Sequence, residues 1–222
     1  MINVTLIPDI MHENGWVKGE TLMRKWFAGN TTFDKTTITV EWTLGFKRAK
    51  KVYDRILNEK LYVNAPAQVE IVKLAKKYRV YNNKGGYFGA VAGNIIDLHS
   101  EYIQHGAVAD GIRAPVDDLL AALGDFSYRV LVEGEVRKRI KTPRLFCISK
   151  IGIFIYDSYD FNGWQPLGYW NKDTNYGGKD IFKGSYVSNR SFRDYRKKYK
   201  KGKDFIVLSN IVVHNVKEWF YK

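Results

Sequence analysis

The sequence predicts an α+β fold, because the spacing of its apolar residues changes near residue 124. Before that point apolar residues recur at helical intervals, and after it they alternate with polar residues as in strands. Aromatic and aliphatic residues are spread along the whole chain, so a sizeable core can form and intrinsic disorder is excluded. We expect a helical N-terminal region over residues 1–95 and a mainly antiparallel, β-rich domain over residues 96–222.

Four segments carry the helical pattern. The first two show apolar stripes, namely Trp16, Leu22, Met23, Trp26 and Phe27, then Val40, Leu44, Ala49, Val52, Tyr53, Ile56 and Leu57. A third helix is expected to begin at Asn64, a good N-cap, with Pro66 in its first turn. Its inner side is expected to hold Val69, Val72, Leu74 and Ala75. A short helix over residues 115–123 should end at Gly124.

Three later segments have the pattern of strands. Residues 126–136 alternate between apolar and polar side chains, as in a half-buried strand. Residues 145–156 form a nearly continuous apolar run that suits a buried central strand. Residues 205–213 predict a further strand, bent at Ser209 and Asn210.

The excess of positive charge favours anionic partners but does not distinguish one kind of anion from another. The 222 residues carry a net charge of +13, which favours nucleic acid, anionic lipid or a phosphorylated substrate. The single cysteine cannot form an internal disulfide. Residues 1–20 lack a basic segment followed by an apolar run, and no segment has the roughly 18 apolar residues of a membrane span. We therefore expect a protein made in the cytoplasm without a signal peptide.

The sharpest local feature is the segment 157–162, with the sequence Asp-Ser-Tyr-Asp-Phe-Asn, directly after the buried strand. If the strand continues, Asp157 and Tyr159 share one face and Asp160 lies at its exit. Two carboxylates at a sheet end can hold a divalent cation, or one of them can act as a general base. The alternative is a simple turn, since Asp and Asn are common where strands end.

This segment, together with residues 123–127 and 132–134, resembles the catalytic domain of colicin M and related M-type bacteriocins. His214 lies in a C-terminal strand where this family also places a histidine. The resemblance covers roughly residues 100–218 and implies an open β-barrel or sheet for that part. Residues 15–16 and 23–27 of the helical front instead resemble uncharacterised proteins found near bacterial type VI secretion clusters.

The colicin M-like resemblance implies an enzyme and its site. Such enzymes hydrolyse the peptidoglycan precursor lipid II between undecaprenyl and pyrophosphate, with magnesium, at the periplasmic membrane face. Carried over by position, the functional acidic and phenolic residues are Asp157, Tyr159 and Asp160, and Asp157 and Asp160 would bind Mg²⁺ or another divalent cation.

The chain departs from the family pattern after the motif, where a His-Arg pair is missing. An insertion could move the pair to Asn189 and Arg190, with Arg193 as a substitute phosphate ligand and His214 as the base. Further substrate contacts would come from Asn162, Asn189, Trp164 and Trp170. The two tryptophans would line an isoprenoid groove, although filling of the core is the alternative.

Residues 190–203 are strongly basic and predict an amphipathic helix. Its cationic face would hold Arg193, Arg196 and Lys200, and an aromatic stripe would hold Phe192, Tyr195 and Tyr199. The helix could simply pack its aromatic residues on the sheet, or its cationic face could also dock on anionic phospholipid. Nucleic acid ranks lower as a partner, because no named nucleic-acid motif accompanies the basic residues.

The colicin M-like resemblance implies an antibacterial toxin that hydrolyses lipid II in the periplasm of target bacteria, and the lack of an export signal predicts secretion by a contact-dependent machine. Its expected partners are lipid II at the membrane surface, a cognate immunity protein and a secretion-system carrier. Two alternatives remain open. The same fold could act as a pore-forming or depolarising effector, or the chain could be a nucleic-acid-binding or nuclease module.

Overall fold

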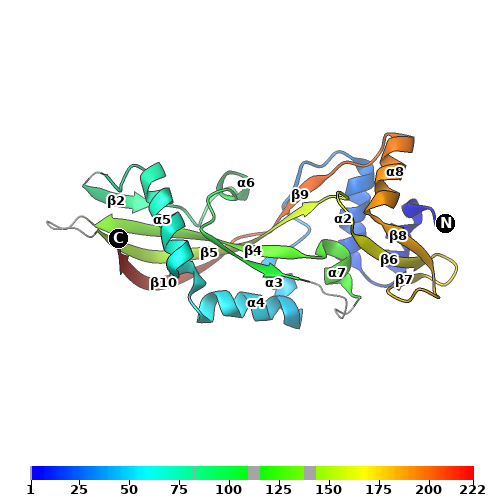
Figure 1. Cartoon of the computed structure of the whole chain (residues 1–222), viewed down its shortest axis with the longest axis horizontal. Helices are drawn as coiled ribbons and strands as arrows, with labels where there is room; N and C mark the ends of the chain where they lie inside the picture. Colours follow the sequence, from blue (N-terminus) through cyan, green and yellow to red (C-terminus); the bar gives the residue numbers. More distant parts are fainter. Residues whose placement is uncertain (1, 83, 110–115, 138–143) are drawn as a thin grey trace. The chain divides into compact units, whose positions relative to one another are not determined.

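The computed structural model describes residues 2–82, 84–109, 116–137 and 144–222. The fold is α+β with an open, curled, antiparallel-rich sheet, which confirms the fold class predicted from the sequence (Figure 1). The chain forms two compact units that interleave along the sequence. Unit 1 comprises Met1–Ile38, Ala109–Phe126 and Asp157–Val207, and unit 2 comprises Thr39–Val108, Ser127–Tyr156 and Leu208–Lys222. Neither unit begins or ends at residue 95, and the boundary expected there stays a prediction.

Unit 1 combines helices with a small separate sheet. Its helical elements are η1 (Val4–Leu6), α1 (Ile7–Glu13), α2 (Val17–Ala28), α7 (Asp118–Leu123) and α8 (Asn189–Tyr199). Its strands are β1 (Phe33–Asp34), β6 (Pro166–Asn171), β7 (Tyr176–Gly178), β8 (Ser185–Ser188) and β9 (Phe205–Leu208), of which β9 ends one residue beyond the unit. β6 lies between β7 and β8, while β9 pairs in parallel with β1.

Trp26 of α2 forms the centre of the core of unit 1. Its ring is fully buried and meets the rings of Phe161 and Phe192 edge-on, at centroid distances of 4.8 Å and 5.5 Å. Phe161 and Phe192 stack face to face at 3.9 Å. The indole N–H of Trp26 donates to Asp204 at 2.9 Å. This aromatic cluster fixes the start of α8 against the segment that follows Tyr159.

Unit 2 is built on a long antiparallel sheet. Its helical elements are α3 (Val40–Leu44), α4 (Lys47–Asn58), η2 (Leu61–Val63), α5 (Ala65–Lys77) and α6 (Ile95–Leu98). Its strands are β2 (Gly85–Phe88), β3 (Gln104–Val108), β4 (Phe126–Arg137), β5 (Leu145–Tyr159) and β10 (Val212–Tyr221), and β5 runs on into unit 1. β5 pairs with β4 and β10, and β4 also pairs with β2 and β3.

Helices α4 and α5 pack beside β3 in unit 2 and appear in cyan in Figure 1. α4 buries Ala49, Tyr53 and Ile56, and a Cβ at Gly106 of β3 would lie only 2.9 Å from Val52. The helices approach this strand closely because glycine leaves the space open.

Most helix boundaries agree with the sequence prediction, with two corrections. Asn64 caps α5, as its side chain accepts from the Ala67 N–H at 3.0 Å. The prediction that Val69 lies on the inner side of this helix is wrong, because Val69 is 50% exposed and Ile71 is buried instead. The stripe over residues 40–57 is divided between α3 and α4, since the chain turns at Gly45. Helix α7 ends at Gly124 as expected, and Pro115 lies outside the described residues.

The expected bend at Ser209 and Asn210 is confirmed as a break between β9 and β10. The Ser209 hydroxyl accepts from the Ile155 N–H at 2.8 Å, and the Asn210 side chain accepts from the Val40 N–H at 3.0 Å. These bonds to neighbouring segments replace the ladder that a continuous strand would make. No helix in the described part of the chain is long and apolar enough to cross a membrane.

Candidate functional site

The carboxylates expected at the sheet end lie at the end of β5, which continues to Tyr159. Asp157 is half-buried, and Asp160 follows the last strand residue. The pKa of Asp157 is raised to about 8, mainly by burial and also by the charges of Asp160 and Asp125, against the opposing bond from the Ser158 N–H. Near neutral pH Asp157 therefore both holds and releases a proton, which is the property of a general acid or base.

Asp160 stabilises the turn that follows β5. One carboxylate oxygen accepts from the Ser158 hydroxyl at 2.7 Å, and the other accepts from the Asn162 N–H at 2.9 Å. These bonds are typical of the turn that was the alternative interpretation of this segment. Each oxygen keeps a second lone pair, so the turn leaves Asp160 able to bind a further partner.

Tyr159 is a core residue in the structure. Its ring stacks on Phe205 at 5.0 Å, and its hydroxyl donates to the Met23 sulfur at 3.8 Å. Only 8% of the residue is exposed, and burial raises the pKa of the phenol, with Asp157 adding to the effect. A hydrogen bond from this hydroxyl to a substrate phosphate would require the side chain to leave the core.

The segment after Asp160 packs against the beginning of α8. The Asn189 amide donates to the Asn162 carbonyl, and the Asn189 N–H donates to the Gln165 carbonyl at 3.0 Å. The Arg193 guanidinium donates to the carbonyls of Phe161 and Gly163 at 2.7 and 2.8 Å. The structure therefore brings together Asn162, Asn189 and Arg193, which the sequence placed in one site.

A small cavity of about 50 Å³ opens beside this contact. It is lined by Gly163, Trp164, Gln165, Pro166, Tyr186, Ser188, Arg190 and Arg193. Trp164 is 91% exposed, and the Arg190 guanidinium lies 3.6 Å from Asp194 with a largely exposed side chain. Two arginines next to the first turn of a helix favour an anion, because the helix N-terminus adds partial positive charge.

Asn189 adds an unsatisfied group at this place. It is 2% exposed, and its side-chain oxygen has no hydrogen-bond partner among the described residues. Leaving a buried acceptor without a donor costs about 1–3 kcal/mol. Such a cost is common where a ligand or water completes the site.

The chain belongs to a family of unknown function (DUF6402). The family model matches residues 30–176 and 179–220, which include every candidate residue named above. No curated protein and no solved structure matches the chain.

Two of the expected site residues have packing roles in this family member. Trp170 is 7% exposed, its indole N–H donates to the Leu167 carbonyl at 2.8 Å, and its ring meets Trp16 edge-on. His214 belongs to unit 2, where its Nε2 lies 2.7 Å from the Tyr53 hydroxyl. Burial lowers the pKa of His214.

A metal site at the end of β5 would have only a few protein ligands. Among the described residues no group of at least three His, Cys, Asp or Glu side chains could hold a metal ion. Mg²⁺ commonly uses one or two carboxylates and fills its other positions with water and substrate phosphate. Asp157 and Asp160 supply hard oxygen donors, and the charge of Asp160 acts on Asp157, so the two fit this kind of shared site.

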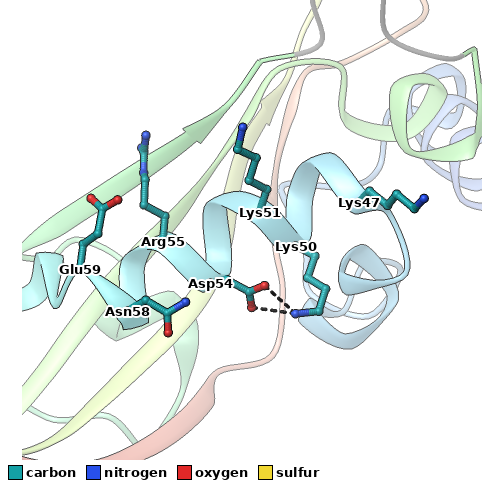
Figure 2. A pocket seen from close by; sticks show the side chains of 7 residues that line it. All are labelled: Lys47, Lys50, Lys51, Asp54, Arg55, Asn58 and Glu59. Carbon is teal, nitrogen blue, oxygen red and sulfur yellow. Dashed lines mark hydrogen bonds and ion pairs between the residues drawn. The ribbon is translucent and has the colours of Figure 1, made fainter.

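A hollow of about 450 Å³ lies along α4 in unit 2 (Figure 2). It is lined by Lys47, Lys50, Lys51, Asp54, Arg55, Asn58 and Glu59. All its lining residues come from α4 and its C-terminal cap, Glu59, and the Lys50 ammonium pairs with the two Asp54 oxygens at 2.6 and 2.8 Å. Lys51 and Arg55 extend to the other side of the helix in Figure 2. We regard the hollow as the solvated face of an amphipathic helix, because no second element supplies converging groups.

The sequence interpretation missed Asp125, Tyr186 and Ser188. Asp125 acts on the pKa of Asp157, and the other two line the cavity. A signal for Asp125 existed, since it directly precedes the strand that pairs with β5. Tyr186 and Ser188 are typical strand and cap residues, so nothing in the sequence distinguished them.

Proposed function

We propose that the chain is an antibacterial effector that hydrolyses lipid II between undecaprenyl and pyrophosphate. One observation carries the proposal: the segment that follows Asp157 and Asp160 also forms the wall of the cavity with Arg190 and Arg193. A proton-transfer group and a cationic pocket for the leaving group are thus connected by a few residues. Phosphoester hydrolysis needs both of these elements.

Asp157 supplies the acid–base function in this proposal. Its pKa of about 8 lets the carboxyl give a proton to the departing oxygen, or lets the carboxylate take one from the attacking water. Water adds across the bond between undecaprenyl and the pyrophosphate oxygen: the hydroxyl of the water joins the lipid as its alcohol, and the pyrophosphorylated headgroup leaves. Asp157 thereby replaces His214 as the general base, because the Nε2 of His214 already contacts the Tyr53 hydroxyl at 2.7 Å.

The arginines act on the pyrophosphate. Arg190 projects from the first turn of α8 and is free to turn towards a ligand, since its contact with Asp194 at 3.6 Å is exposed. Arg193 is held by two carbonyls and shapes the cavity wall. A guanidinium in this position neutralises the charge that develops on the leaving group. Trp164 offers an exposed apolar surface beside it.

Asp160 and the ionised form of Asp157 would hold Mg²⁺ or another divalent cation together with the substrate phosphates, and with the ion bound Asp157 would act as the base and not as the acid. The ion supplies charge neutralisation on the pyrophosphate when it is bound. Binding can be tested without turnover, because the ion requires the ionised form of Asp157. We expect Mg²⁺ to raise the melting temperature of the wild type at pH 7 and to leave that of Asp157→Asn unchanged.

The biological setting of the proposal rests on the resemblance to colicin M-like toxins. The effector would be secreted with a carrier, would act in the periplasm of a target cell, and would be neutralised by an immunity protein in the producer. A depolarising effector predicts toxicity that survives substitution of the aspartates, and a nuclease predicts toxicity in the cytoplasm. Expression with and without an added export signal distinguishes these alternatives.

The deciding experiment incubates the purified protein with lipid II and Mg²⁺ and measures release of the pyrophosphorylated headgroup. We expect release by the wild type and by Asp173→Asn, an exposed carboxylate of the same unit. Asp157→Asn, Asp160→Ala and Arg190→Ala should each lose about 100-fold or more, which is the usual contribution of a proton-transfer or charge-stabilising group. No release from folded wild type would refute the proposed function.

A further inference from the structure

The turn between β7 and β8 exposes two large apolar side chains that the proposed reaction does not use. The turn comprises Lys179, Asp180, Ile181, Phe182, Lys183 and Gly184. Phe182 is 92% exposed and Ile181 is 57% exposed. Adjacent exposed apolar residues at the tip of a turn commonly mark a binding surface.

The turn is held in a fixed conformation. The Asp180 carboxylate accepts from the Phe182 N–H at 3.0 Å, and the Asp180 carbonyl accepts from the Lys183 N–H at 3.3 Å. The Tyr176 hydroxyl accepts from the Asp180 N–H at 2.9 Å, which ties the turn to β7. The apolar side chains are therefore presented outward by backbone and side-chain bonds rather than left exposed by chance.

Positive charge flanks the apolar pair on both sides. Lys179 precedes it and Lys183 follows it, and the whole chain carries a net charge of +13. The Lys183 ammonium lies 3.6 Å from Asp180 and 5.6 Å from the Tyr176 ring, so it stays beside the tip. An apolar tip between lysines complements a surface that has an apolar interior and anionic headgroups.

We infer that this turn docks unit 1 on an anionic phospholipid surface, with Ile181 and Phe182 inserted at the headgroup–acyl boundary. A stable protein partner would need about 800 Å² on each side, which two side chains at a tip do not supply. A single-stranded nucleic acid would favour stacking rings, whereas Ile181 is aliphatic. The inference needs no catalysis and goes beyond the proposed function.

Two exposed aromatic residues of unit 2 provide matched controls. Tyr87 of β2 is 79% exposed and Trp219 of β10 is 66% exposed. Both lie on regular strands and not at the tip of a turn. General attraction of exposed aromatic rings to lipid would involve these residues as much as Phe182.

The test measures co-sedimentation of the full chain with vesicles of phosphatidylcholine, alone or mixed with phosphatidylglycerol in equal amounts, without lipid II. We expect binding to the mixed vesicles that weakens with salt. The double variant Ile181→Ser/Phe182→Ser should lose about tenfold or more in partition coefficient, because it removes most of the inserted apolar surface. Tyr87→Ser and Trp219→Ser should each stay within about twofold of wild type, since exposed positions outside the contact contribute little. Lys179→Gln/Lys183→Gln should reduce binding to the mixed vesicles only.

Three results would overturn the inference. They are equal binding by the double variant, equal loss in the unit 2 controls, and no preference of wild type for the mixed vesicles. Because the vesicles lack lipid II, this measurement succeeds or fails independently of the hydrolysis assay. Circular dichroism of each variant shows whether the fold is kept, which we expect for a position as exposed as Phe182.

Discussion

Both units hold matched polar pairs, but unit 1 also holds a carboxyl group with a strongly raised pKa. In unit 2 the Tyr53 hydroxyl lies 2.7 Å from His214, Lys150 is paired with Glu133 at the same distance, and one side-chain nitrogen of Arg144 lacks a hydrogen-bond partner among the described residues. In unit 1 Asp157 has a raised pKa, and the buried oxygen of Asn189 has no partner in the described part of the chain. Polar groups left at an energetic disadvantage gather where a ligand completes the site. The comparison therefore places the candidate chemistry in unit 1.

The largest expected effect concerns Asp157. Its pKa is raised from 3.8 to about 8 in the folded chain, so the folded state binds an extra proton between these values. Stability from this group is complete below about pH 4 and is lost as the pH rises to about 8. Over this interval we expect the free energy of unfolding of Asp157→Asn to rise by up to about 5 kcal/mol relative to that of the wild type. Urea denaturation of both proteins across the pH range measures the difference.

The control for this prediction is Asp160→Asn, which keeps the carboxyl of Asp157. We expect Asp160→Asn to lose stability as the pH rises, as the wild type does. The loss should be smaller, because one of the charges that raise the pKa of Asp157 is gone. A constant difference between Asp157→Asn and wild type at all pH values would show that Asp157 is not held protonated. The contrast between the units would then lose its main support.

A smaller effect is expected for Arg196 of α8. Arg196 pairs with Asp204 and lies 5.1 Å from the Trp26 ring, so it is part of the core cluster and does not belong to a free cationic face. Arg196→Met should cost about 2 kcal/mol, because Asp204 loses its cation in a half-buried setting. Lys197→Met on the same helix is exposed and should be nearly neutral. Thermal unfolding of both variants tests this assignment.

The sequence was sufficient to predict the fold class and several long elements, but not the small sheet of β6, β7 and β8 or the partners of individual side chains. Helix and strand positions follow from local periodicity, so α2, α5, β4 and β5 appear where the spacing of apolar residues predicts them. The face predicted to be cationic on α8 is partly engaged within the chain, because Arg193 donates to the Phe161 carbonyl and Arg196 donates to Asp204, eight residues further along. Helical spacing shows which residues share a face and carries no information on what that face meets.

The candidate site shows the same division. The pattern of strand followed by Asp157 and Asp160 predicted carboxylates at a sheet end, and the structure has them there. The burial of Tyr159 on Phe205 depends on packing between distant segments, so no local pattern could show it. His214 was associated with the aspartates by resemblance alone, while its observed neighbour is Tyr53.

A third prediction concerns that His214–Tyr53 contact. Tyr53→Phe and His214→Gln should each cost about 1 kcal/mol, and the double-mutant cycle should show coupling, since both remove the same hydrogen bond. The pKa of His214 is lowered in the folded chain, so its contribution is present above the ordinary value of 6.5 and is lost as the pH falls below it. Denaturation at pH 5 and pH 8 measures both effects.

Lipid II hydrolysis gives the same variants a second readout. Tyr53→Phe and His214→Gln should both keep wild-type turnover, because the proposed acid–base group is Asp157. Loss of turnover in His214→Gln together with unchanged stability would restore the histidine as the base. That result would mean that both units supply catalytic residues. The contrast drawn between the two units would then no longer hold.

The smallest effect is expected on the basic face of α4. Lys51→Gln and Arg55→Gln should each change the free energy of unfolding by less than about 0.5 kcal/mol, because both side chains are exposed on an amphipathic helix. Neither should change lipid II hydrolysis or vesicle binding, since unit 1 carries the residues assigned to both. A large loss in either assay would show that the hollow of Figure 2 binds a ligand, and unit 2 would then hold a functional site of its own.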